Sequence, residues 1–201
     1  MQCLYVNRDI DKDVDKDRYK AKQILGRISS LKNSLITVNA YFNPLNNEIV
    51  FPAAILQPPF YNFTADEAVN YGGIGAVIGH EISHAFDDSG ARFDGDGNVN
   101  NWWTDVDLIE FEKRGNALAE QYSAIEVLDS VYINGKFTLG ENIGDLGGVL
   151  GAYDGLQLYM NENGRPDNID GFTAKDNLIT GKSKAKAASG AVQLESWKEN
   201  Y

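Results

Sequence analysis

Two short runs of β-branched and aromatic residues predict a β-hairpin in the first third of the chain. The runs ITVNAYF and EIVFPA, within residues 36–57, lie on either side of NPLNN, a sequence rich in turn-forming residues. Such runs, separated by a few turn residues, are typical of two strands joined by a tight connection. Pro52 has no backbone N–H to donate to a sheet, so we expect it at a sheet edge or at the end of the second strand.

Residues 65–86 follow the period of an α-helix. Small and apolar positions recur at steps of three and four residues, at Val69, Gly73, Ala76, Val77 and His80. The run GGIGAVIG within this segment is too apolar for a helix on the protein surface. The pattern therefore predicts a buried helix.

A second helix is predicted to begin near Thr104. Thr104 and Asp107 resemble a capping box, with Asp in place of the usual Glu or Gln. The positions expected to form its buried stripe are Leu108, Phe111, Leu118, Tyr122 and Ile125. Further along, the pair Asn134–Gly135 lies between two short β runs, which predicts a second hairpin.

A third helix is predicted from about Leu139 to Met160. Four glycines fall on or near one face of it, at Gly144, Gly148, Gly151 and Gly155. Because each glycine weakens a helix by roughly 1 kcal/mol, we expect them to be compensated by close packing against another helix. The sequence becomes polar from Asn161 onward, and residues 179–191 are predicted to be a linker or a disordered tail.

The composition narrows the classes of partner. The 201 residues carry a net charge of −11, whereas nucleic acid and anionic membranes are bound through basic patches, so we expect neither as a partner. No apolar stretch is long enough to span a membrane, and the first residues lack the order of a signal peptide. The single cysteine, Cys3, excludes an intrachain disulfide and a thiolate-rich zinc cluster.

The sequence HEISH contains the only two histidines of the chain, His80 and His84. Their spacing places both side chains on one face of a helix, where they can bind one metal ion, and Glu81 lies beside them. This is the pattern of zinc hydrolases, in which the metal lowers the pKa of a bound water to about 7 and the glutamate takes its proton. The alternative is an ordinary amphipathic helix, but a glutamate within an apolar helix is costly without a partner or a task.

A catalytic zinc needs a third protein ligand, and a carboxylate is expected because no histidine remains. The best candidates are Glu141 and Asp145, which are four residues apart in GENIGDLGG. One of them can bind the metal while the other accepts the ring N–H of a histidine ligand. Asp87 and Asp88 are rivals for the third ligand.

Several longer blocks resemble the catalytic domain of the neprilysin-like zinc metallopeptidases. They are VNAYFNP, NEIVFPAAILQPPF, NYGGIGAVIGHEISHAFDDSG, NWW and LGENIGDLGG, and they occur in the family's order between about Thr37 and Gly171. The resemblance implies a helix-dominated α+β fold, with a thermolysin-like zinc-protease core and an edge β-hairpin. It also implies one Zn²⁺ per chain and a zinc-dependent endopeptidase that acts on peptides.

The resemblance assigns a role to each matching residue. It implies that His80, His84 and Glu141 bind zinc, that Glu81 is the general base, and that Asp145 supports a histidine ligand, His80. It further implies that certain residues contact the substrate: Asn39 and Ala40 bind the peptide backbone, whereas Ile55, Phe60 and Val77 line the apolar pocket for a large hydrophobic side chain after the scissile bond. Without the resemblance, the last three residues would be assigned to the core.

The chain also departs from this family. Members are usually about three times longer, with a large helical domain over the active site, and they carry a later histidine that stabilises the oxyanion and an arginine that binds the substrate's carboxylate end. The sequence has no third histidine, and losing one such donor costs about 10²–10³ in rate. The alternative function is therefore a zinc- and peptide-binding module with little or no catalysis, and a weaker alternative is a remnant that binds no zinc.

We expect three segments along the chain. Residues 1–35 form a charged N-terminal segment without clear family similarity, residues 36–172 form the metallopeptidase core, and residues 173–201 form a polar C-terminal tail. Since the family is mostly membrane-anchored, secreted or periplasmic, the resemblance suggests such a location. The sequence leaves the peptide substrate and the oligomeric state open.

Overall fold

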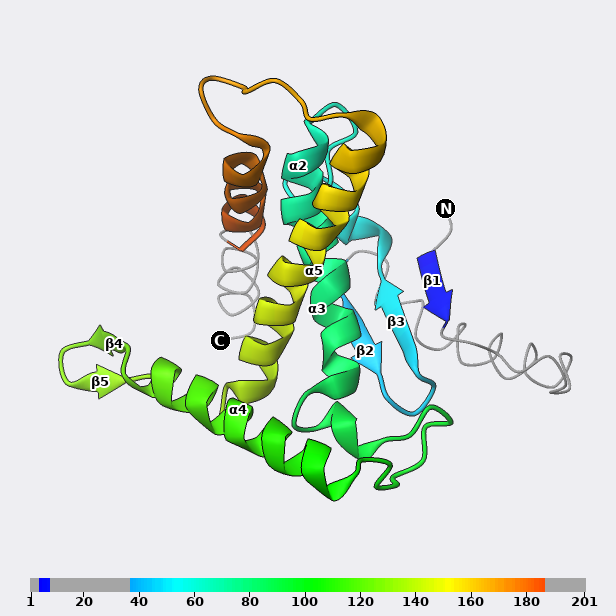
Figure 1. The fold of residues 1–201 in the computed structure, drawn as a ribbon, viewed down its shortest axis with the longest axis vertical. Helices are drawn as coiled ribbons and strands as arrows, with labels where there is room; N and C mark the ends of the chain where they lie inside the picture. The colour runs from blue at the N-terminus through cyan, green and yellow to red at the C-terminus, as the bar shows by residue number, and fades with distance from the viewer. Residues whose placement is uncertain (1–3, 8–36, 187–201) are drawn as a thin grey trace, which may run out of the picture.

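The computed structural model describes residues 4–7 and 37–186. Most of the predicted N-terminal segment 1–35 and the last fifteen residues of the predicted tail lie outside the described residues. The described part has a small sheet on one side of the histidine-bearing helix, one long helix packed along that helix, a second long helix across the lower end of the molecule, and a further helix in its upper half (Figure 1). The predicted class, a helix-dominated α+β fold, is confirmed.

The sheet is antiparallel with the strand order β1-β3-β2. It contains β1 (Leu4–Asn7), β2 (Tyr41–Asn43) and β3 (Glu48–Phe51). β2 and β3 form the predicted hairpin, in which Phe42 pairs with Ile49. β3 ends immediately before Pro52, as expected for a residue without a donor. β2 is left at an edge of the sheet.

The predicted helix over residues 65–86 forms as four consecutive helical segments. They are α2 (Glu67–Asn70), the π-helical turn η2 (Tyr71–Gly75), α3 (Ala76–Ser83) and the 3₁₀ turn η3 (His84–Phe86). At the π turn, the backbone N–H of Ile74 donates to the carbonyl of Phe60 at 2.7 Å. The segment around Phe60 is thereby tied to the helix that carries the histidines.

The predicted third helix is α5 (Leu139–Asn163), which runs alongside α3 (Figure 1). Glycine permits this close approach: a Cβ atom on Gly148 would lie 2.3 Å from the carbonyl oxygen of Ala76, and one on Gly144 would lie 2.8 Å from the ring of His80. The predicted packing is confirmed at these two positions, whereas Gly151 has nothing within 4 Å of a Cβ atom.

The predicted second helix is α4 (Asp105–Ser123), capped by Thr104, whose hydroxyl accepts from the N–H of Asp107. Its predicted stripe is only half-buried, and Ile125, beyond the end of the helix, is exposed. A short hairpin follows, made of β4 (Glu126–Leu128) and β5 (Val131–Tyr132). Two 3₁₀ turns, η1 (Ala53–Ile55) and η4 (Gly90–Arg92), complete the named elements.

The second hairpin turns at Asp129–Ser130, so its predicted turn at Asn134–Gly135 is wrong. Gly135 has another role. Its N–H donates to the hydroxyl of Ser123 at 3.1 Å, and a Cβ atom there would lie 2.0 Å from the carbonyl oxygen of Ala119. The glycine thus allows the chain to pass close to α4 before α5 begins.

Residues 174–186 are helical, which corrects the prediction of a linker for the described part of 179–191. Thr173 caps this helix: its hydroxyl accepts from the N–H of Asp176, and its own N–H donates to the Asp176 carboxylate. Leu178 and Ala185 are fully buried. Leu178 packs with Ala76 and Leu156 in one core cluster, whereas Ala185 joins the cluster under the sheet.

Two core clusters result. The cluster under the sheet contains Ala40, Ile49, Phe51, Ile55, Phe60 and Ala185, and the cluster between the helices contains Ala68, Ala76, Ala152, Leu156, Met160 and Leu178. Among the described helices, none combines the length and the apolar character needed to cross a membrane.

Candidate metal centre

Three predicted ligand side chains meet at one point. His80 at the end of α3 and His84 at the start of η3 lie one helical turn apart, and their rings are 4.6 Å apart at an angle of 87°. Glu141, in the first turn of α5, reaches both: its carboxylate lies 3.3 Å from Nε2 of His80 and 3.8 Å from Nε2 of His84. Among the described residues, this is the one group of three that can hold a metal ion.

The geometry fits zinc. Tetrahedral zinc holds nitrogen and oxygen ligands at about 2.0–2.2 Å, which places neighbouring ligand atoms about 3.4 Å apart. The separations between the Glu141 oxygens and the two Nε2 atoms are 3.3 and 3.8 Å, and all three ligand atoms lie within 4.8 Å of one another. Two imidazoles and one carboxylate are also a set of ligands that binds zinc in catalytic sites.

Each histidine has a carboxylate at its other ring nitrogen. Nδ1 of His80 lies 3.2 Å from Asp145, and Nδ1 of His84 lies 2.7 Å from Asp87. When each ring is neutral with its proton on Nδ1, that nitrogen donates to the carboxylate, and Nε2, directed at Glu141, has a lone pair for a metal. Asp145 is where the sequence predicts it.

The carboxylate of Asp87 lies at Nδ1 of His84, whereas a third metal ligand would lie near Nε2. One of its oxygens accepts from the His84 ring, and the other accepts from the backbone N–H groups of Ser89 and Gly90 at 2.8 and 2.6 Å. The carboxylate therefore fixes both the histidine and the turn that follows it. The sequence signal for this contact is the three-residue spacing between His84 and Asp87. Asp88 is exposed.

The carboxylates strongly favour protonated histidines in the metal-free protein. Burial alone would lower the pKa of His80, but the hydrogen bonds to Asp145 and Glu141 outweigh it and raise the pKa to about 9. The hydrogen bond to Asp87 likewise raises the pKa of His84. The His80 hydrogen bond lowers the pKa of both Asp145 and Glu141. A cation is thus strongly preferred at this point.

Glu81 is the buried acid of the site. Its side chain is 5% exposed, and burial raises its pKa, although the two histidines act in the opposite direction. A backbone hydrogen bond from Phe42 links it to strand β2. Glu81 also borders the same hollow as His80 and Glu141. It therefore lies where a carboxyl group can exchange a proton beside the metal position.

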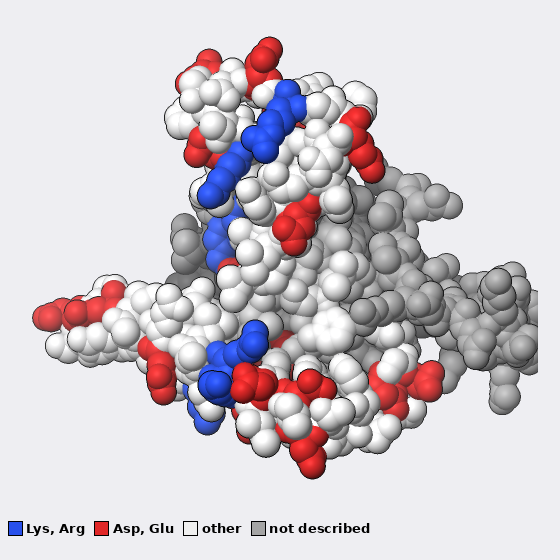
Figure 2. Space-filling view, viewed as in Figure 1, with Lys and Arg blue, Asp and Glu red and all other residues white. Residues whose placement is uncertain are grey.

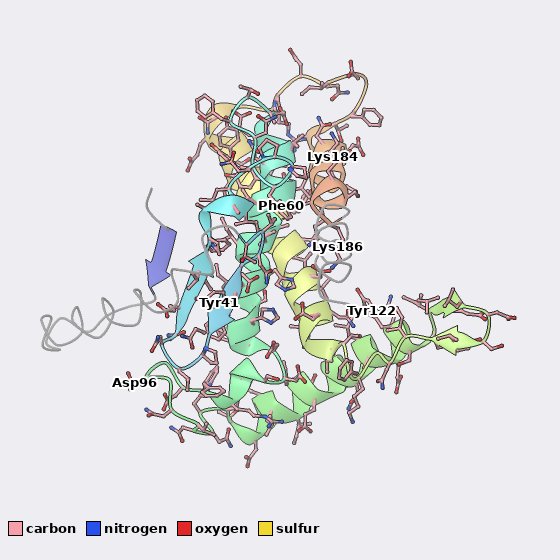
Figure 3. All side chains as sticks on the ribbon, turned by 180° about the vertical axis from the view of Figure 1, so that it is seen from behind. Tyr41, Phe60, Asp96, Tyr122, Lys184 and Lys186 are labelled. Atoms are coloured by element: carbon pink, nitrogen blue, oxygen red, sulfur yellow. The ribbon has the colours of Figure 1, made fainter. Side chains whose placement is uncertain are left out.

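The cluster opens into two adjoining hollows. One, of about 400 Å³, is lined by His80, Glu81 and Glu141 together with Ile55, Phe60 and Val77. Asn39 borders both hollows, and Ala40 borders the second along β2. Figure 3 labels Phe60, which lines the first hollow, and Tyr41 on β2, which lines the second. All the residues that the sequence predicts to contact a substrate thus surround the metal cluster.

Two lysines that sequence reasoning missed also belong to this site. Nζ of Lys182 and Nζ of Lys186 each lie 2.8 Å from an oxygen of Asp145, and both lysines line the hollow that contains Ile55, Phe60 and Val77. Both come from the helix at residues 174–186, where the sequence predicts a polar tail. The regular spacing of Leu178, Lys182 and Ala185 was the available signal for a packed helix.

The chain is similar to known proteins over most of its length. Residues 39–183 match peptidase family M13. Neprilysin-11 of Caenorhabditis elegans is 49% identical over 166 residues, which cover 77% of this chain and 20% of the relative. Human endothelin-converting enzyme 1 is 49% identical over 142 residues, which cover 71% of this chain and 18% of the relative. The chain thus spans about a fifth of the length of these curated relatives.

Solved structures show the same similarity. The crystal structure of the Mycobacterium tuberculosis zinc metalloprotease Zmp1 with an inhibitor superposes with a TM-score of 0.71 at 55% identity, covering 74% of this chain and 23% of that one. PepO from Lactobacillus rhamnosis superposes with a TM-score of 0.63 at 38% identity, covering 74% and 22%. The extent of the family match and the identities lead to one conclusion: the chain belongs to peptidase family M13, the neprilysin-like peptidases.

Proposed function

We propose that this chain hydrolyses internal peptide bonds as a zinc-dependent endopeptidase. The observation that carries the proposal is the convergence of His80, His84 and Glu141, with both Nε2 atoms directed at one carboxylate. In this proposal the three side chains hold one zinc ion. The carboxylates of Asp145 and Asp87 keep the two rings in the orientation that binding requires.

Zinc bound at this position supplies two effects: it lowers the pKa of a water molecule to about 7, and it polarises the carbonyl of the peptide bond. Glu81 performs the proton transfers. Its carboxylate accepts a proton from the water that attacks the carbonyl carbon, and it then donates this proton to the amide nitrogen as the C–N bond breaks. The products are a new carboxyl terminus and a new amine. The raised pKa of Glu81 suits both steps, because a base and an acid are needed in turn.

The substrate is proposed to align along β2. This strand lies at the edge of the sheet, and the residues that lead into it, Asn39 and Ala40, border the hollows next to the cluster. An extended peptide can add to such an edge through backbone hydrogen bonds. Ile55, Phe60 and Val77 then provide an apolar pocket for the side chain after the scissile bond. Large hydrophobic residues are therefore proposed at that position.

Hydrolysis of an internally quenched peptide by the zinc-loaded chain tests this function. The peptide carries Phe or Leu after the scissile bond, and a peptide with Gly there is its comparison. We expect Glu81→Gln to retain one zinc per chain and to lower kcat by about 10²–10⁴, because only the proton transfers are lost. The exposed Glu120 offers a matched control, Glu120→Gln, which should leave turnover unchanged.

Two results would contradict the proposal. Turnover that is equal in the wild-type chain and in Glu81→Gln would remove the assigned base. One bound zinc with no turnover of any peptide would indicate the alternative, a zinc- and peptide-binding module.

A further inference from the structure

We infer that Trp103 is a positioning residue for the candidate metal ligand His84, which it holds through the turn of residues 87–91 without touching the metal position. The inference rests on the proposed zinc site. It gives a role to the sequence NWW at residues 101–103, which the proposed peptidase mechanism does not use.

The turn of residues 87–91 lies directly against His84. A Cβ atom on Gly90 would overlap the carbonyl oxygen of His84, so the backbone of η4 is in contact with the backbone of the ligand. The carboxylate of Asp87 holds the same turn from the other side. One of its oxygens accepts from the N–H of Gly90 at 2.6 Å, and the other accepts from the His84 ring at 2.7 Å. A displacement of Gly90 must therefore move either the His84 backbone or the carboxylate that orients its ring.

Trp103 fixes the outer end of this turn. Its indole N–H donates to the carbonyl of Ala91 at 2.9 Å, and the N–H of Ala91 donates to the carbonyl of Asp87 at 3.0 Å. Ala91 is buried and the indole is half-buried, so both hydrogen bonds are partly shielded from water. Two hydrogen bonds thus connect Trp103 to Asp87, and a third connects Asp87 to the His84 ring.

The indole is itself anchored to the long helix α4. The ring of Trp103 lies 5.3 Å from the ring of Phe111, one and a half turns into this helix, which is a favourable separation for an aromatic pair. The chain directly after the indole is fixed as well, because Thr104 caps α4. Trp103 therefore connects the turn behind His84 to a helix of nineteen residues.

The charged side chains of α4 are arranged differently. Figure 2 shows acidic and basic side chains over the lower end of the molecule, where α4 lies in Figure 1. The ion pairs of Glu110 with Lys113 and Arg114 are exposed and lie within α4. They join the helix to itself, whereas Trp103 joins it to the turn after His84. The effect of Trp103 on the metal site should therefore be insensitive to salt.

The zinc affinity of the full chain, measured by competition with a chromophoric chelator, tests the inference. Trp103→Phe keeps an aromatic ring but removes the N–H that holds Ala91. We expect the affinity to fall about three- to tenfold, because one hydrogen bond behind the ligand is lost. Trp102→Phe is the matched control. The indole N–H of Trp102 donates to the carbonyl of Phe93, beyond η4, so this variant should change the affinity less than about twofold.

A second control separates positioning from a general loss of stability. Met160 is buried in the cluster between the helices, at the opposite end of α5 from Glu141. Met160→Ala should lower the melting temperature at least as much as Trp103→Phe but leave the zinc affinity of the folded chain within about twofold of the wild type. The visible absorption of Co²⁺ bound in place of zinc reports the geometry of the ligands. We expect this spectrum to change in Trp103→Phe and to stay as in the wild type in Met160→Ala.

The outcomes decide the role of Trp103 separately from peptidase activity. A zinc affinity of Trp103→Phe within twofold of the wild type, or an equal loss in Trp102→Phe or Met160→Ala, would overturn the inference while leaving the zinc site intact. Zinc binding without turnover would contradict the proposed peptidase and leave these affinities to decide. A wild-type chain that binds no zinc would refute both proposals.

Phe111→Leu replaces Trp103→Phe if circular dichroism shows that the latter does not fold. It keeps the indole N–H but removes the ring against which Trp103 packs. We expect the zinc affinity to fall about threefold. An affinity equal to that of the wild type would then overturn the inference.

Discussion

At the scale of single residues, the site depends on carboxylates paired with histidines. Glu141 lies between the two Nε2 atoms, while Asp145 and Asp87 each lie at an Nδ1 atom. A metal-binding histidine that is held by such a partner has one tautomer and one ring orientation before the metal arrives. The affinity for zinc should therefore depend on residues that never touch the ion.

Asp87→Asn tests this dependence. Asparagine can still accept from the N–H groups of Ser89 and Gly90, but it loses the charged hydrogen bond to the His84 ring. We expect the affinity for zinc, measured by competition with a chromophoric chelator, to fall about 10–100-fold. Asp88→Asn is the control, because Asp88 is exposed, and it should leave the affinity unchanged. Equal effects of the two substitutions would contradict the role of Asp87.

The His80 pKa predicts how the stability of the metal-free chain changes with pH. The folded chain raises this pKa from an ordinary value of 6.5 to about 9. Protonated His80 therefore contributes stability in full below about pH 6.5, and this contribution is lost as the pH rises through 9. Allowing for partial solvent screening, the loss is about 1–3 kcal/mol.

Urea unfolding in the presence of a chelator measures this change between pH 6 and pH 9. His80→Gln removes the titrating group and should flatten the dependence. A wild-type free energy of unfolding that stays constant or rises over this range would contradict the assignment.

At the scale of the elements, the site exists because α3 and α5 approach closely. The histidines come from the helical segments α3 and η3, whereas Glu141 and Asp145 come from α5, so the distance between the helices sets the distance between the ligands. Gly144 and Gly148 have no side chain where the helices meet. A methyl group at this contact would separate the ligands from one another.

Gly148→Ala tests the helix contact. The new Cβ atom would lie 2.3 Å from the carbonyl oxygen of Ala76, so α5 must shift. We expect thermal unfolding to report a destabilisation of about 1–3 kcal/mol, together with weaker zinc binding. Gly151→Ala is the control, since its Cβ atom meets nothing within 4 Å, and it should stabilise the chain by up to about 1 kcal/mol. If Gly148→Ala behaves like Gly151→Ala, the glycine contact does not set the geometry.

The elements also show what the sequence can predict. Runs of β-branched and aromatic residues around a turn sequence identified the β2–β3 hairpin, and apolar residues and glycines at helical spacing identified the helices α3, α4 and α5. The motif around His80 and the carboxylates of GENIGDLGG identified the metal cluster, since chemistry restricts zinc ligands to few residue types. The π turn at Tyr71–Gly75 has no such local signal, and the N–H of Ile74 within it is bonded to a carbonyl of another segment, that of Phe60.

Local signals failed where tertiary contacts decide the structure. Asn134–Gly135 has the composition of a hairpin turn, but Gly135 is required for close passage along α4. Residues 179–186 have the composition of a linker, but Lys182 is held against Asp145 from a helix far away in the sequence. A lysine that pairs with a half-buried acid looks the same in the sequence as one that faces solvent.

At the scale of the whole molecule, the chain holds all the side chains of the candidate site. The three candidate ligands, Glu81 and the carboxylates behind the histidines lie between residues 80 and 145. The chain spans about a fifth of the length of its curated relatives, and exposed apolar residues occur on its two long helices, including Ile109 on α4 and Leu150 on α5. Metal binding can nevertheless be measured on this chain directly.

Zinc titration of the metal-free chain, with Glu141→Ala beside the wild type, is the most direct test of the central claim. We predict one zinc ion per wild-type chain and an affinity at least 100-fold lower in Glu141→Ala, because the variant loses the carboxylate that completes the three-ligand site. A wild-type chain that binds no zinc, or a Glu141→Ala variant that binds it with the wild-type affinity, would contradict the account.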